Sequence, residues 1–397
     1  MRALVLSGGG SKGSYQIGVW KALRDMDIKF DIVTGTSAGA LNAALITQRS
    51  YKTALKTWKK INLDILFGED RIESNETIDL YKMYGKKFLK DGGMNTSKIE
   101  QIIKDALVPS KFYKSKTDFG LVTYNLTTKK PIQLTKKDIP QDLLDDYLMA
   151  SATCFPAFQK KKINGEHFID GGYYDNLPIN LAIEMGADEI IAVDLSAPGL
   201  KKTPNKKVKT ITIKPKNKLT NFLNFYEEGA ERNIKLGYND TLKAFNKCEG
   251  NKYTFKKGHI EKNNNMYQET YEHITSKILK FKGATKDFYK QLNLSLELPF
   301  KLEDKILLRV MELVAKDFNI DETEIYSYRS FNRKIRKELR KRIKLLETNP
   351  NTKKHKKTEV ELFLEMQKGN YNELRKLGLL NPIELLKAVY LYTICED

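Results

Sequence analysis

The sequence predicts an α/β domain followed by a helical C-terminal region. In the first half of the chain, short apolar runs alternate with helical patterns, as in a sheet with crossover helices. From about residue 217 the pattern becomes helical, and after about residue 250 no strong strand pattern recurs. The 397 residues are enough for two domains. We therefore expect an α/β domain over residues 1–250 and a helical region of unknown role over residues 251–397.

The expected elements of the first domain follow one another in a regular order. A strand over residues 2–7 precedes a helix over residues 15–26, and a strand over residues 31–36 precedes an alanine-rich helix over residues 40–48. Further strands are expected where apolar and β-branched residues recur, the first two of them as a hairpin: residues 119–126, 130–134, 167–170, 189–195 and 208–215.

The C-terminal region contains a strongly basic helical segment. Phe331, Ile335, Leu339, Ile343 and Leu346 have near-helical spacing, and Arg and Lys fill most positions between them. Residues 329–357 hold 13 Lys and Arg against 2 Asp and Glu. Farther on, Asn381 and Pro382 are typical of a helix start, and residues 383–395 resemble a buried helix.

Composition limits the partners and the compartment. The net charge of +19 favours anionic partners, such as nucleic acid, acidic lipid surfaces or phosphate-bearing substrates. Cys154, Cys248 and Cys395 are far apart, which indicates neither a disulfide framework nor a zinc site. The N-terminus has no secretory pattern, and no apolar run reaches the roughly 18 residues that a spanning helix needs. We expect a cytoplasmic protein that contacts the inner membrane face peripherally.

One stretch, residues 35–39, matches the pattern G-x-S-x-G around Ser37. The pattern alone is common in structural turns. Here it follows an expected strand and precedes an expected helix, which is the setting of a nucleophile elbow. Gly35 and Gly39 leave room where side chains would collide with the neighbouring strand and helix. The context therefore favours Ser37 as a nucleophile.

A glycine-rich loop follows the first strand and has three interpretations. Its residues are Gly8, Gly9, Gly10, Ser11, Lys12 and Gly13. A P-loop fails because Lys12 precedes Gly13 instead of Ser or Thr. A dinucleotide fingerprint fits the glycine spacing, with Asp25 or Asp27 as the acid. An oxyanion hole, in which backbone N–H groups bind the negative oxygen of a tetrahedral intermediate, is the interpretation that also explains Ser37.

A nucleophilic serine needs a base, and histidine is the usual partner. His259, His273 and His355 lie in the polar C-terminal region and are expected at the surface, while His167 is expected to be a strand side chain. Asp170 ends a short apolar strand and is followed by Gly171 and Gly172. A partly buried carboxylate with a raised pKa can accept the serine proton directly. Asp170 is therefore the predicted base.

Together these stretches resemble the patatin-like phospholipase family, whose pattern is a G-G-G-x-K/R-G loop, a G-x-S-x-G elbow and a D-G-G/A motif. Here the motifs are residues 8–13, 35–39 and 170–172. Residues 150–158 (ASATCFPAF) and 175–178 (DNLP) also look like the family. Residues 237–240 (GYND) resemble the end of the catalytic domain of its bacterial members. The match covers roughly residues 1–250.

The resemblance implies a three-layer α/β/α fold and hydrolysis of lipid acyl esters by a Ser-Asp dyad, without a metal or organic cofactor. Ser37 would attack the ester carbonyl, Asp170 would accept its proton, and the amides of residues 8–13 would hold the oxyanion. Apart from the resemblance, residues 51–115 lie between the elbow and the next expected strand and are rich in Lys and aromatic residues, and from this position we expect them to form a cap over the acyl pocket. The alternatives are an acyltransferase that uses the same acyl-enzyme and a catalytically silent lipid-binding protein.

The basic segment has two interpretations. Residues 331–346 can lie on an anionic membrane through their apolar stripe, or the stripe can pack against the domain. Nucleic-acid binding fits less well, because no helix-turn-helix, zinc-finger or aromatic platform accompanies the charge.

Overall fold

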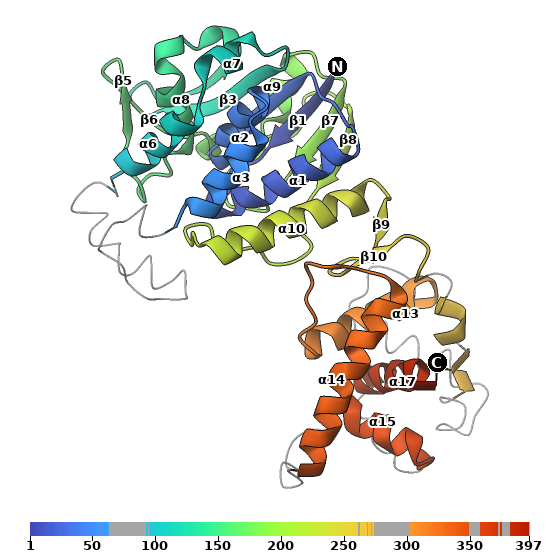
Figure 1. The fold of residues 1–397 in the computed structure, drawn as a ribbon. Coiled ribbons are helices and arrows are strands. Elements are labelled where there is room, and N and C mark those ends of the chain that lie inside the picture. The colour runs from blue at the N-terminus through green and yellow to red at the C-terminus, as the bar shows by residue number, and fades with distance from the viewer. Residues whose placement is uncertain are drawn as a thin grey trace. The chain divides into compact units, whose positions relative to one another are not determined.

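The computed structural model describes residues 1–62, 93, 95–260, 263–267, 269–270, 272–273, 302–348, 358–371, 374 and 382–396. The chain divides into two compact units, Met1–Phe245 and Asn246–Asp397, each described here by itself. Figure 1 shows strands and helices mixed in the first unit and mainly helices in the second.

An eight-stranded sheet forms the centre of the first unit, in the order β5-β6-β3-β2-β1-β7-β8, with β4 paired to β3. Strands β3, β2, β1, β7 and β8 are parallel, while β4, β5 and β6 run antiparallel to their neighbours. The strands are β1 (Arg2–Leu6), β2 (Ile32–Thr36), β3 (Asp118–Asn125), β4 (Lys130–Thr135), β5 (Lys161–Ile163), β6 (Glu166–Asp170), β7 (Glu189–Val193) and β8 (Lys209–Ile213).

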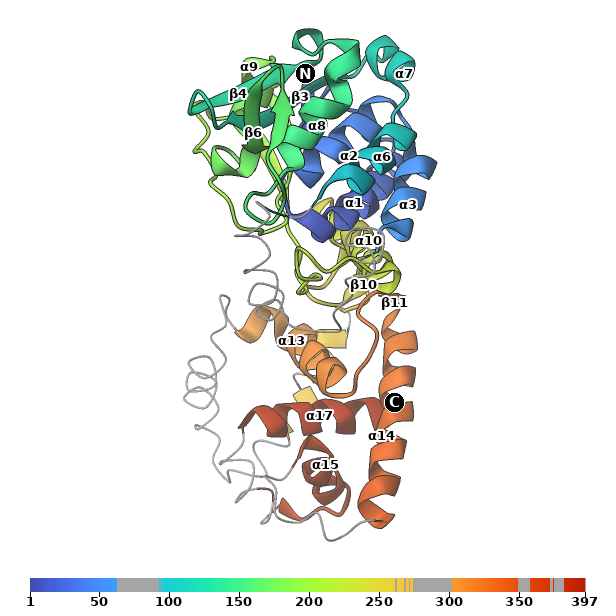
Figure 2. The same ribbon diagram turned by 90° about the vertical axis from the view of Figure 1, so that its left-hand side faces the viewer.

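Helices cover both faces of this sheet. Along β1, Ala3 and Val5 point to one face, and Leu4 and Leu6 point to the other, as the two-residue period of a strand requires. The face of Leu4 and Leu6 packs on α1 (Ser14–Asp25), α2 (Ala38–Thr47), α8 (Leu144–Ala152) and α10 (Glu227–Ala244). The opposite face packs on α9 (Ile179–Glu184), and Figure 2 shows the sheet between α9 on one side and α1 and α2 on the other. The fold is the expected three-layer α/β/α arrangement.

The expected strands of this unit are all present, and the predicted hairpin is the antiparallel pair of β3 and β4. Strand β5 was not predicted, because three residues around a tight turn carry too little pattern. Between α2 and β3, the described residues form the helices α3 (Tyr51–Lys60), α6 (Ser97–Ala106) and α7 (Pro109–Lys114).

The second unit has its own core, to which all four of its longer described helices contribute. These helices are α13 (Leu302–Asp317), α14 (Tyr328–Thr348), α15 (Glu359–Gln367) and α17 (Pro382–Glu396). The buried C-terminal helix was expected, and α17 confirms it; Asn381, its expected cap, lies outside the described residues. No strong strand was expected after about residue 250, and the strands found there are short, but the expectation of an all-helical region was wrong. Strands β9 (Cys248–Glu249), β10 (Thr254–Lys256) and β11 (Ile325–Tyr326) form a small sheet, too short for a sequence pattern.

The apolar stripe of α14 faces the interior of the second unit. Phe331, Ile335 and Leu339 are at most 2% exposed, and Ile343 and Leu346 pack against the same core. The stripe therefore packs on the domain, which was the second interpretation of this segment, and it is not exposed for insertion into lipid. No helix in the described ranges combines the length and apolar character needed to cross a bilayer.

Candidate active site

Ser37 lies at a sharp turn between β2 and α2. Strand β2 ends at Thr36 and helix α2 begins at Ala38, so one residue makes the whole connection. Its backbone has φ 57° and ψ −131°, which a residue with a side chain rarely adopts. Such a conformation costs on the order of 1–3 kcal/mol and persists where the surrounding structure enforces it. The predicted strand–turn–helix setting of Ser37 is therefore present.

The glycines on either side of Ser37 allow the turn to form against the sheet. A Cβ on Gly39 would lie 2.3 Å from the carbonyl oxygen of Leu6 in β1. A Cβ on Gly35 would lie 2.3 Å from the carbonyl oxygen of Gly39. Both neighbours are backbone atoms that cannot turn away, so a side chain at either position would force α2 off the sheet.

Ser151 holds the turn from the other side. Its hydroxyl accepts a hydrogen bond from the Ser37 N–H at 3.0 Å and donates one to the carbonyl oxygen of Val122 at 2.7 Å. Ser151 lies on α8 and is fully buried. Ser151 lies in the family-like stretch 150–158, but its role could not be predicted from the sequence, because a serine within a helix has no signal of its own.

The strand register brings Asp170 beside Ser37. Strand β4 pairs along one edge of β3, so β2 and β6 share the other edge. The last residue of β2, Thr36, pairs with Val122, and Asp170 at the end of β6 pairs with the next residue of β3, Thr123. Strand β6 therefore pairs with β3 directly beyond the point where β2 ends. This brings Ser37 and Asp170, which are 133 positions apart in the chain, next to each other.

Asp170 is buried and hydrogen-bonded. The residue is only 6% exposed, and its side chain accepts a hydrogen bond from the Gly172 N–H at 2.7 Å. Burial raises the pKa of the Asp170 carboxyl to about 6, against the smaller opposing effects of the nearby Ser37 hydroxyl and the Gly172 N–H, which favour the charged form. A carboxylate with this pKa is ionised near neutral pH and basic enough to accept a proton.

The described histidines do not take the position of the base. His167 lies on β6, as expected, and within the described ranges no histidine lines either cavity beside Ser37. His355 lies outside the described residues.

The amides of the glycine-rich loop are only partly available to a ligand. The N–H groups of Gly8, Ser11 and Lys12 donate to the carbonyl oxygens of Asn176, Phe222 and Gly9. In the described structure, the N–H groups of Gly9 and Gly10 have no hydrogen-bond acceptor. Both residues line the cavity that contains Ser37, and Gly13 closes the 3-10 turn Gly10–Gly13.

A third amide belongs to the same group. Ala38 is the first residue of α2, and the first N–H groups of a helix have no acceptor within it. In a nucleophile elbow the N–H after the nucleophile joins the oxyanion hole. Ala38 was not among the predicted site residues, although the elbow pattern itself was the signal that could have found it.

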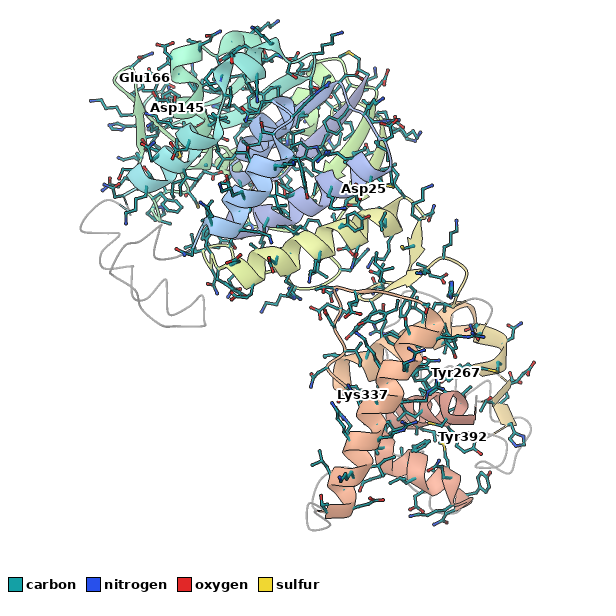
Figure 3. The ribbon with its side chains drawn as sticks, in the orientation of Figure 1. Asp25, Asp145, Glu166, Tyr267, Lys337 and Tyr392 are labelled. Carbon is teal, nitrogen blue, oxygen red and sulfur yellow. The ribbon has the colours of Figure 1, made fainter. Side chains whose placement is uncertain are left out.

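The loop does not suit a dinucleotide. The carbonyl oxygen of Phe222 lies 2.1 Å from where a Cβ on Gly10 would be, so another segment of the chain covers the loop. The candidate acid Asp25 lies at the end of α1 (Figure 3), where it pairs with Lys21 at 2.6 Å. The residue after β2 is Ser37 and not an acid. The fingerprint spacing was therefore coincidental.

Two cavities meet at Ser37. The wider one, of about 520 Å³, contains both Ser37 and Asp170. It is lined in part by Asn176, Tyr173 and Phe222. Its wall thus includes both polar and apolar groups.

The narrower cavity, of about 100 Å³, extends from Ser37 between helices of the first unit. Its lining is almost entirely apolar and includes Leu41, Leu45, Trp58, Ile103, Leu148 and Phe158. Trp58 and Ile103 come from the segment 51–115 that the sequence analysis expected to cap an acyl pocket. Part of that segment, residues 63–92 and 94, lies outside the described residues.

A buried polar network connects this narrow cavity to the glycine-rich loop. The Trp58 indole N–H donates to Asn42 Oδ1 at 2.7 Å, and Asn42 Nδ2 donates to the carbonyl oxygen of Gly13 at 2.9 Å. Gln16 completes the network by donating to the carbonyl oxygen of Ser7 at 2.7 Å. The cavity wall and the loop therefore hold each other in place.

No candidate metal site was found among the residues that the structure describes. No group of three or more His, Cys, Asp or Glu side chains there is arranged to bind an ion.

Comparison with known proteins agrees with this arrangement. A family model described as patatin-like phospholipase matches residues 4–183, a range that contains the loop, the elbow and Asp170. The patatin-like phospholipase domain-containing protein 7 of Rattus norvegicus is 32% identical over 203 residues, which cover 49% of this chain and 14% of that protein. Lysophospholipase nte1 of Aspergillus terreus is 29% identical over 207 residues, 49% of this chain and 12% of that protein. The chain thus spans about one-seventh or less of the length of these curated relatives.

Among solved structures, VipD from Legionella pneumophila is similar with a TM-score of 0.42 and 15% identity, over 99% of this chain and 90% of VipD. No functional conclusion follows from a similarity of this level.

Proposed function

Because residues 4–183 are a patatin-like phospholipase domain, we propose that this protein is a serine acyl hydrolase that cleaves fatty-acyl ester bonds of phospholipids or lysophospholipids. The observation that carries the proposal is that Ser37, on its strained turn, and the buried carboxylate of Asp170 line the same cavity. A nucleophile and a base side by side, next to space for a substrate, are what acyl transfer requires.

The first step forms an acyl-enzyme. Ser37 Oγ attacks the ester carbonyl carbon while Asp170 accepts the hydroxyl proton, and the carbonyl oxygen becomes an oxyanion. Collapse of this tetrahedral intermediate breaks the carbon–oxygen ester bond. The proton moves from Asp170 to the leaving alcohol, which departs and leaves the acyl chain on Ser37.

The free amides of Gly9 and Gly10, together with that of Ala38, are the proposed oxyanion donors. Preorganised N–H groups stabilise the charge that develops in the transition state, and losing one donor typically costs roughly 100- to 1,000-fold in rate. The remaining loop amides support the loop through their own hydrogen bonds, so their proposed role is structural.

The two cavities support an orientation for the substrate. A fatty-acyl chain suits the narrow apolar cavity between α2, α3 and α6, whose wall has little to bond with a polar group. The glycerol and head group suit the wider cavity that contains Asp170 and Asn176. The ester carbonyl then lies at Ser37, where the cavities join. A relative named lysophospholipase agrees with a substrate of this class.

The second step releases the fatty acid. Water enters the wider cavity after the alcohol has left and gives a proton to Asp170 as it attacks the acyl carbon. The tetrahedral intermediate collapses, the bond to Ser37 Oγ breaks, and the proton returns to the serine. An acyltransferase would use an alcohol in place of water at this step. The polar groups in the wall of the wider cavity, among them Asn176, can hold the attacking water.

The test is fatty-acid release, measured by mass spectrometry, from a panel of phospholipids, lysophospholipids and neutral glycerides. Wild type is compared with Ser37→Ala and Asp170→Asn, which change few atoms and leave the fold intact. We expect release by wild type and at least about a 1,000-fold loss in both variants. Equal release by all three proteins would contradict the assignment, and inertness of all three on every substrate would favour a silent lipid-binding protein.

A further inference from the structure

The solvent side of α14 carries a row of basic residues. Six exposed cations are separated by steps of four, four, three, one and three residues: Arg329, Arg333, Lys337, Arg340, Lys341 and Lys344. At 100° per residue they occupy about one-third of the helix circumference. Figure 3 shows Lys337 on this outer side of α14. We call these six residues the basic face.

The other three cations of α14 are occupied within the second unit. Lys334 pairs with Glu324 at 2.7 Å, Arg342 pairs with Glu359 at 3.4 Å, and Arg336 donates to the carbonyl oxygen of Ile394. On the basic face, Lys341 pairs with Glu338 at 2.7 Å. The remaining five make no ion pair with any described residue.

This charge distribution is unfavourable for the isolated unit. Like charges three or four residues apart on a helix destabilise it by a few tenths of a kcal/mol per pair. The face also has a fixed shape, because Phe331 and Ile335 on the opposite side are completely buried. From Arg329 to Lys344 it extends about 22 Å along a rigid helix. An extended anionic surface would neutralise the whole row at once.

We propose that the basic face of α14 docks this protein on an anionic lipid surface by electrostatic attraction, without insertion of the apolar stripe. This docking rests on the proposed function, because the substrate of a phospholipid hydrolase lies in such a surface. Insertion is excluded as the mode of binding because Phe331, Ile335 and Leu339 are in the core. A nucleic acid is the less suitable partner, since the face offers only cations and no aromatic or amide side chain that could read bases.

The test uses the full-length protein and vesicles of phosphatidylcholine with or without 30% phosphatidylserine. One variant, which we call the ridge variant, removes four charges of the basic face through Arg333→Gln, Lys337→Gln, Arg340→Gln and Lys344→Gln. The matched control carries the same loss of four charges on exposed lysines of the first unit: Lys111→Gln, Lys114→Gln, Lys129→Gln and Lys130→Gln. A third variant, with Lys337→Arg and Lys344→Arg, keeps the charge. Circular dichroism verifies that all variants are folded.

We expect wild type, the control and the charge-keeping variant to sediment with anionic vesicles and to be released by salt. The ridge variant should have a partition coefficient onto anionic vesicles at least about 100-fold lower than that of wild type. Each basic residue near an anionic surface raises this coefficient roughly five-fold, and the variant lacks four of them. Three results would overturn the proposal: binding of the ridge variant equal to that of wild type, equal losses in the ridge variant and the control, or tighter binding to duplex DNA than to vesicles at the same salt concentration.

The same proteins are also assayed on a short-chain ester below its micelle concentration. Hydrolysis of this dispersed substrate needs no surface, so the ridge variant should match wild type. If wild type binds anionic vesicles but does not hydrolyse the ester, the proposed activity is refuted and the docking surface is not. If wild type hydrolyses the ester but the ridge variant binds vesicles as tightly as wild type, the docking surface is refuted and the proposed activity is not.

Discussion

The rate of ester hydrolysis should depend on pH through the ionisation of Asp170. Only the carboxylate can accept the proton of Ser37, so kcat/KM should rise as the pH increases through the pKa of Asp170. Burial sets this pKa at about 6, from an ordinary value of 3.8. The pH profile therefore reports the desolvation of the site.

The size of the effect follows from the two pKa values. With a pKa of about 6, the ionised fraction is about 10% at pH 5 and about 90% at pH 7, a change of roughly nine-fold in kcat/KM. With the ordinary value of 3.8, more than about 90% is ionised at pH 5, and the profile would be flat over the same range. The two cases differ by far more than the error of a rate measurement.

The assay is the initial rate of hydrolysis of a dispersed short-chain ester between pH 4.5 and 8, with circular dichroism at each pH to verify folding. Ser151→Thr, which keeps the hydroxyl, serves as a control for the shape of the profile. A profile that is flat between pH 5 and 7 in folded protein would refute the assignment of Asp170 as a buried general base.

Four further predictions follow from the geometry. Ser151→Ala leaves the buried Ser37 N–H without its acceptor, which costs about 1–3 kcal/mol, and should lower kcat about 10- to 100-fold with little change in KM, measured by steady-state kinetics. Asp170→Asn should raise the free energy of unfolding, measured by urea titration, by up to about 3 kcal/mol at pH 8 and little at pH 4. The reason is the free-energy cost of burying the ionised carboxylate in wild type. This cost is absent below pH 3.8, grows between pH 3.8 and about pH 6, and reaches its full value above pH 6. Gly39→Ala would place a Cβ 2.3 Å from the Leu6 carbonyl oxygen and should lower the melting temperature by several degrees at least, and an unchanged value would contradict the close packing of α2 on β1. Ile103→Trp should fill the narrow cavity and lower kcat/KM for long-chain esters by about tenfold while sparing two- to four-carbon esters, and equal effects on both would contradict the acyl position.

Most of the sheet could be predicted from local patterns. Apolar runs such as residues 2–7 and 189–195 are buried on both faces and have little alternative to a central strand. Short elements such as β5 and β9 to β11 could not, because two or three residues carry no periodicity and their pairing depends on distant partners. The helical stripe of residues 331–346 was visible, but whether it packs on the domain or on lipid depends on tertiary contacts that a single helix does not encode.

The site shows the same division. Gly35, Ser37 and Gly39 were identifiable because a strained turn restricts the residue types that fit it. Ser151 was not, since its role exists only where α8 crosses the end of β2. The availability of the loop amides also depends on distant segments: Asn176 and Phe222 accept bonds from the loop and leave Gly9 and Gly10 free. The sequence pattern therefore identified the candidate reactive residues, whereas their supporting contacts depend on tertiary packing.

The most direct test of the central claim is covalent labelling with a long-chain fluorophosphonate, located by intact-protein and peptide mass spectrometry. The label should react once per protein, at Ser37, and Asp170→Asn should slow the reaction by at least about 100-fold, because the hydroxyl then has no base. Ser37→Ala should not be labelled. Labelling of a different residue, or labelling of Ser37 at the same rate in Asp170→Asn, would contradict the proposed pair of nucleophile and base.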